Sequence, residues 1–179
     1  YMRAYVKILS VDKILGDWSP RVPRMMRKLV DALLPVPDSL IMLRHRDLSV
    51  REVTGITGEL QSWTLLPVGT QTERSRTYLR WRYEENPLRA YRFYQVLEQG
   101  RDRCLFVARH EGGEVTIIDI LCVQGGDIIP ALAMFSCFMR DRGVVALRIS
   151  CIGDMGLKLM MAGFIPRENG LPLITYPLA

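Results

Sequence analysis

The chain has 179 residues, of which 49% are hydrophobic and 24% are charged, and its net charge is +5. This length predicts one domain, and this composition is typical of a globular protein with a buried core. No apolar run reaches the roughly 18 residues of a membrane-spanning helix. The basic residues are mixed with acids and lack an RNP-like motif. We therefore expect neither a membrane span nor nucleic acid as a partner.

The four cysteines all lie within apolar segments, and none forms a CxxC pair. This pattern favours buried thiols over a metal site or a disulfide framework. It predicts a reducing compartment and therefore a cytoplasmic location.

The first 40 residues differ from the remainder of the chain. Residues 23–37 predict a short amphipathic helix that Pro35 and Pro37 end. Prolines on both sides are typical of a connector or a packing arm. A helix lying on a membrane surface is the alternative. Because the chain starts with Tyr1, we predict a connector arm or the tail of a preceding domain at 1–40, followed by one domain at 41–179.

The next segments are harder to interpret. Residues 39–45 favour a strand, and residues 77–87 predict a short helix with aromatic anchors. Arg80, Trp81 and Arg82 on this helix predict a patch that binds an acidic sugar or a partner's carboxylates. The alternatives are that Trp81 belongs to the core and that the arginines form salt bridges with neighbouring glutamates.

From residue 90 onward the patterns are clearer. Three apolar runs separated by glycine turns predict an antiparallel meander over 91–123. The meander is followed by a helix over 130–143 and a strand over 144–150. We then expect a helix over 154–164, capped by Asp154, and a last strand over 171–177. This order predicts an α/β fold in which a mixed, mostly antiparallel sheet is flanked by helices, with an N-terminal helical arm.

Asp119 interrupts the apolar run of the third strand, where a carboxylate is costly to bury. In a regular strand it shares a face with Ile117, Leu121 and Val123. Burial would raise its pKa and suit a general base, so Asp119 is our candidate catalytic residue. The alternatives are an ion pair with Arg148 and exposure on an open face of the sheet. His45 and His110 are weaker candidates that we expect to be exposed.

The order of elements over residues 75–179 resembles the GNAT acyltransferase family. The most specific segments are GLKLMMAGF (156–164) and TYLRWRYEENPLRAYRFYQV (77–96), which are similar to the C-terminal half of bacterial proteins with two GNAT-like domains. The resemblance implies acetyl-CoA as the cofactor and N-acyl transfer to a small-molecule or sugar amine, such as a polysaccharide precursor. It also implies a preceding GNAT domain or a second copy as partner.

In that family, the loop after the central strand holds the CoA pyrophosphate with backbone N–H groups at a helix N-terminus. Its counterparts here are Val123, Gln124, Gly125, Gly126 and Asp127, and the backbone of Val123 would polarise the thioester carbonyl.

This loop departs from the family pattern because it is short and has only two glycines. The carboxylate of Asp127 can also cap the helix in place of a phosphate. Leu159 stands where the family has a tyrosine that protonates the leaving thiolate, and Ile152 replaces an asparagine. These departures favour the alternative that the domain has lost catalysis and acts as a binding or dimerisation module.

Overall fold

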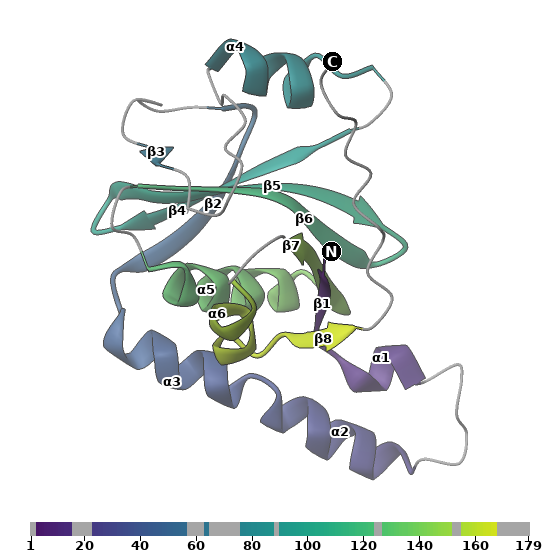
Figure 1. Ribbon diagram of the computed structural model, residues 1–179. Helices are drawn as coiled ribbons and strands as arrows, with labels where there is room; N and C mark the ends of the chain where they lie inside the picture. Colours follow the sequence, from purple (N-terminus) through teal and green to yellow (C-terminus); the bar gives the residue numbers. More distant parts are fainter. Residues whose placement is uncertain are drawn as a thin grey trace.

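The computed structural model describes residues 3–15, 23–56, 63–64, 76–87, 90–123, 127–151 and 155–167. These residues form a mixed sheet with helices on both of its faces (Figure 1). The expected α/β class, with a mostly antiparallel sheet flanked by helices, is confirmed. No helix in the described ranges is long and apolar enough to cross a bilayer.

Seven strands follow the order β2-β4-β5-β6-β7-β1-β8, and β3 pairs with β6. Only β6 and β7 pair in parallel among the described strands, and the other pairs are antiparallel. The strands are β1 (Arg3–Ile8), β2 (Leu48–Val53), β3 (Trp63–Thr64), β4 (Arg92–Glu98), β5 (Arg101–Glu111), β6 (Glu114–Val123), β7 (Ala146–Cys151) and β8 (Ile165–Arg167).

The helices form one layer on each face of the sheet, and the two layers are unequal in size (Figure 1). Helix α5 packs its buried side chains against one face and forms the larger core, while α4 and the π-helical segment η2 cover the other face. The helices are α1 (Val11–Leu15), α2 (Arg24–Leu33), α3 (Val36–Arg44), α4 (Arg76–Leu79), η2 (Arg80–Glu84), α5 (Ile128–Asp141) and α6 (Gly156–Met161).

The expected meander is confirmed as β4, β5 and β6. Gln99 and Gly100 join the first two strands, and Gly112 and Gly113 join the next two. All four have positive φ angles between 51° and 84°, which match tight hairpin turns of the primed types. Cys104 and Cys122, directly opposite each other on β5 and β6, are buried thiols as expected.

Strand β1 lies inside the sheet and not in an arm outside it. It pairs with β7 over its whole length and with β8 over three residues. Residues 3–8 therefore belong to the same sheet as the segments beyond residue 41, contrary to a separate arm at 1–40. An origin of this segment in a preceding domain stays a prediction.

The expected strand at 39–45 is wrong, because this segment belongs to α3. Pro35 and Pro37 end the preceding helix, as expected, but they also open the next one. Proline is tolerated in a first helical turn, where its missing N–H has no intrahelical partner. Strand β2 begins only at Leu48. The strand expected at 171–177 and the cap expected at Asp154 lie outside the described residues.

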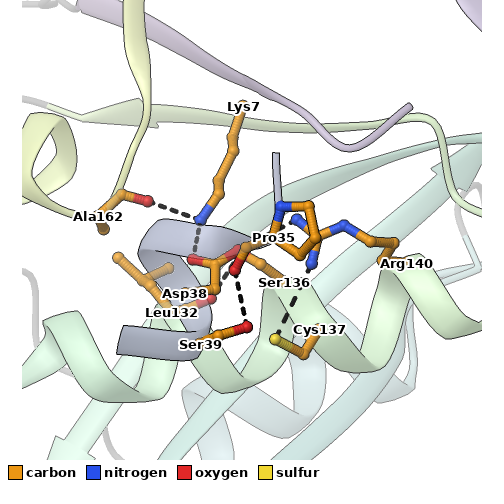
Figure 2. Close-up of polar contacts among 9 residues, drawn as sticks. All are labelled: Lys7, Pro35, Asp38, Ser39, Leu132, Ser136, Cys137, Arg140 and Ala162. Atoms are coloured by element: carbon orange, nitrogen blue, oxygen red, sulfur yellow. Dashed lines mark hydrogen bonds and ion pairs between the residues drawn. The ribbon is translucent and has the colours of Figure 1, made fainter. Parts of the chain in front are cut away.

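A buried carboxylate joins four elements (Figure 2). Asp38 of α3 is 1% exposed and accepts from Lys7 of β1 at 2.5 Å and from Arg140 of α5 at 3.1 Å. Lys7 also donates to the carbonyl of Ala162, just after α6, at 2.7 Å. Because an unpaired buried charge is costly, these contacts fix α3 against β1 and α5.

We predict that Asp38→Ala lowers the free energy of unfolding by about 3–5 kcal/mol, because Lys7 would remain buried without its carboxylate. Urea denaturation measures this value. Asp141→Ala, which removes an exposed carboxylate, is the control and should change the value by less than about 0.5 kcal/mol. Equal effects of the two substitutions would contradict the role of Asp38.

The same network predicts a pH dependence. Burial lowers the pKa of Lys7, and the attraction of Asp38 offsets burial only in part. The unfolded chain therefore binds the Lys7 proton more tightly than the folded chain. Stability should thus rise with pH between the lowered pKa and about 10.4. In urea titrations, the natural protein should gain stability relative to Lys7→Met as pH rises through this range. A constant or falling difference would contradict the shift.

Candidate functional site

Strands β6 and β7 run side by side for only part of their length. Residues 114–117 of β6 pair with 146–149 of β7, and residues 122–123 pair with β3 on the same edge. The described parts of β6 and β7 therefore diverge after residue 117, in the interior of the sheet.

A β-bulge lies where the two strands part. Val107 pairs with Asp119 and Ala108 pairs with Ile117, so that Ile118 is the extra residue. Ile117 lies in the core under α5, whereas Leu121 lies in the cluster under α4 and η2. The expectation that Asp119 shares a face with Ile117 is wrong, because the bulge reverses the alternation between them.

The carboxylate of Asp119 is half-buried and points toward η2. Tyr83 donates its hydroxyl to Oδ2 at 2.9 Å, and the backbone N–H of Ile120 donates to Oδ1 at 2.9 Å. The alternative ion pair with Arg148 is wrong, since Arg148 pairs with Glu114 at 2.5 Å. Asp119 is thus held in one orientation where the two strands diverge, with Tyr83 beside it.

Helix α4 and η2 form the layer that covers Asp119. Leu79 and Tyr83, four residues apart, are buried against β4, β5 and β6 and anchor this helix. The N–H of Glu85 donates to the carbonyl of Arg80, five residues earlier, which makes the last turn π-helical. Such turns are frequent at functional sites.

The three residues of the predicted patch have different surroundings. Trp81 is 64% exposed, so its alternative assignment to the core is wrong. Arg80 pairs with Glu85 at 3.0 Å and Glu84 at 3.8 Å, as the salt-bridge alternative expects. The patch that remains for a ligand consists of Trp81 and the neighbouring Arg82.

Arg82 connects this patch to Asp119. Its guanidinium donates to the hydroxyl of Tyr78 and lies 5.4 Å from the ring centre of Tyr83. Burial alone lowers the pKa of Arg82, but the hydrogen bond with Tyr78 and nearby charges, including Asp119, outweigh burial and raise it. The structure thus brings the predicted base and the predicted patch to one face of the sheet.

The N-terminus of α5 offers few free donors for an anion. The side chain of Asp127 accepts from the N–H of Ile129 at 3.1 Å and caps the helix, as expected. Pro130 in the same turn has no N–H. Gln124, Gly125 and Gly126 lie outside the described residues, and Val123 pairs with β3. The described residues at this helix end therefore do not fit a pyrophosphate cradle.

The remaining candidates lie away from Asp119. Leu159 of α6 is fully buried in the larger core, and Ile152 lies outside the described residues. His110 and His45 are half-buried, not exposed as expected. His110 lies 2.7 Å from the hydroxyl of Tyr94, a residue of the α5 core, and burial lowers its pKa. Among the described residues, no group of acids, histidines and cysteines could hold a metal ion.

The chain matches no protein-family model, and no curated protein shows significant similarity to it. Sequence analysis missed Tyr83 and Tyr78 as members of the site. Their five-residue spacing gave no signal of this, because side chains three or four residues apart meet on an α-helix, whereas the segment Arg80–Glu84 is π-helical.

We predict that Asp127→Ala lowers the free energy of unfolding by about 1 kcal/mol, because α5 loses its side-chain cap. Asp141→Ala, at the other end of the same helix, is the matched control. It should leave stability unchanged or slightly raised, since a negative charge there opposes the helix dipole. Thermal or urea unfolding of both variants measures how each end of α5 contributes to stability. An Asp127→Ala protein with unchanged stability would contradict the capping role of Asp127.

Proposed function

We propose that this chain is a GNAT-like domain that transfers an acyl group from acetyl-CoA to an amine, with Asp119 as the general base. The observation that carries the proposal is the parting of β6 and β7 beside the bulge at Ile118. This arrangement places a carboxylate held by Tyr83 where the two strands diverge.

The chemistry requires an unprotonated amine. Acetyl-CoA, when bound, supplies the acyl group as an activated thioester. Asp119 would accept the proton that the amine loses as its nitrogen joins the acyl carbon, while the C–S bond of the thioester breaks and the leaving thiolate takes a proton from water. Tyr83 and the N–H of Ile120 orient the carboxylate.

The proposed acceptor is an amine on a sugar or another polysaccharide precursor. The exposed ring of Trp81 offers a flat apolar face, and Arg82 offers a planar pair of donors that suits a carboxylate or hydroxyls. Arg82 and Tyr83 are consecutive in η2, which would bring a molecule bound at the patch toward Asp119.

A second candidate is a binding module without catalysis. It is favoured by the cap of Asp127 on α5 and by Leu159, which has no proton to donate to a leaving thiolate. In this case the domain binds partner molecules, and acyl transfer takes place outside this domain.

Calorimetric titration of acetyl-CoA separates the two candidates. Because Asp127 occupies a donor that a phosphate would need, we expect the natural chain to bind acetyl-CoA weakly and the Asp127→Gly variant to bind it more tightly. Saturable binding by the natural chain at micromolar Kd would overturn our interpretation of the cap. If neither protein binds, the acyl-transfer proposal fails for this chain and the module remains.

The role of Asp119 is tested in the Asp127→Gly background with acetyl-CoA and glucosamine, by following the release of thiol. We expect Asp119→Asn to lower kcat about 10²–10⁴-fold. The residual rate of the Asp119→Asn variant should rise with pH, because more of the amine is then already unprotonated in solution. Asp141→Asn is the control, and an unchanged rate in Asp119→Asn would exclude Asp119 as the base.

A further inference from the structure

The outer side of α2 and α3 carries a continuous row of apolar side chains. Helix α2 buries none of its residues, and α3 buries only Asp38. Each side chain of the row is between 44% and 61% exposed. The row, called the α2–α3 stripe below, consists of Met26, Leu29, Leu33, Val36, Leu40 and Leu43.

The stripe alternates steps of three and four residues, which is the spacing of a helix–helix seam. Leu34 and Pro35, between the two helices, both have right-handed helical angles, so the helical rotation continues from α2 into α3. Figure 1 shows the two helices end to end along one side of the molecule. Exposed apolar rows of this length are rare on monomeric proteins and mark interaction sites.

The exposed charges along the stripe are mainly positive. The only acids between residues 24 and 46 are Asp31 and Asp38, and both are turned toward the protein. Asp31 accepts from Ser10 and the N–H of Val11, and Asp38 is buried. The exposed charged residues between 24 and 46 are basic and lie toward the two ends of the stripe: Arg24, Lys28, Arg44 and Arg46. One exposed acid, Asp47, follows Arg46, so the basic residues outnumber it.

A groove adjoins the stripe between α2, β1 and the residues after α6. It has a volume of about 230 Å³, enough to receive a large apolar side chain from a partner. Its lining residues are Lys7, Ile8, Val30, Leu33, Leu34, Pro37 and Gly163.

Three occupants of the stripe are disfavoured. A second copy would place basic ends beside basic ends in either helix orientation. The sequence of residues 171–179 contains Pro172 and Pro177 and lacks the apolar spacing of a matching amphipathic helix. A lipid surface would favour aromatic anchors, whereas neither the stripe nor its exposed neighbours Met25 and Val30 include an aromatic residue.

We propose that the α2–α3 stripe docks an amphipathic helix of a partner polypeptide. The partner helix carries apolar residues at three- and four-residue spacing, and it carries Asp or Glu beside them to pair with the basic ends. One apolar side chain enters the groove beside Val30 and Leu33. This inference is independent of the acyl-transfer proposal, since the stripe does not include the Asp119 site.

The test uses two labelled synthetic helices of about 21 residues, with Leu at heptad core positions and either Glu or Lys at the flanking positions. Fluorescence anisotropy should show that the Glu peptide binds at micromolar Kd and that added salt weakens binding. The Lys peptide should bind at least roughly tenfold more weakly.

Variants locate the binding surface. Leu29→Ser with Leu33→Ser should abolish binding, because it interrupts the stripe at exposed positions that folding does not require. Reversal of Arg24, Arg44 and Arg46 to Glu should exchange the preference, so that the Lys peptide binds more tightly. Circular dichroism confirms that the variants are folded.

Two controls change similar side chains elsewhere. Leu157→Ser on α6 and Arg101→Glu on β5 should leave the affinity for the Glu peptide unchanged.

Several outcomes would overturn the proposal. They are the absence of binding, equal binding of both peptides, and a dimer in sedimentation equilibrium that the Leu29 and Leu33 substitutions dissociate. Binding to vesicles of phosphatidylglycerol and phosphatidylcholine without binding to the Glu peptide would assign the stripe to a lipid surface. The acetyl-CoA titration is unaffected by any of these results, so failure here and failure of the acyl-transfer proposal are distinguishable.

Discussion

The buried carboxylate of Asp38 is the contact on which the arrangement of the helices depends. It is the only buried residue of α3, and it pairs with cations from β1 and α5. A lone carboxylate at this position would be strongly destabilising, so the geometry is fixed by the two cations that neutralise it. The same contact leaves the opposite, apolar side of α3 and its extension α2 facing outward. One buried network therefore explains both a docked helix and an unpartnered surface.

Strand β6 organises the other face of the sheet. It begins in parallel pairing with β7, loses this partner after Ile117 and changes the orientation of its side chains at the bulge. In a regular strand without the bulge, Asp119 would share the face of Ile117 and point into the apolar core beneath α5. With the bulge, the carboxylate meets Tyr83 under η2 and lies beside Arg82. The bulge thus decides whether the Asp119 carboxylate points into the apolar core or lies beside Tyr83.

The two surfaces proposed to bind ligands are physically separate. The Asp119 site lies under α4 and η2, and the α2–α3 stripe lies on the side of the sheet that α5 covers (Figure 1). Docking at the stripe can therefore proceed without blocking an acceptor at Trp81.

The sequence by itself determined the elements whose signals are local. The meander, helix α5 and the Asp127 cap follow from apolar periodicity, turn glycines and a capping residue, all within a few positions of one another. The tertiary structure alone decided the place of β1 in the sheet, the exposure of Trp81, the inward direction of Asp31 and Asp38, and the face of Asp119. Each of these depends on which distant segment a residue meets, as Asp38 meets Lys7 and Arg140, and no local pattern encodes such a meeting.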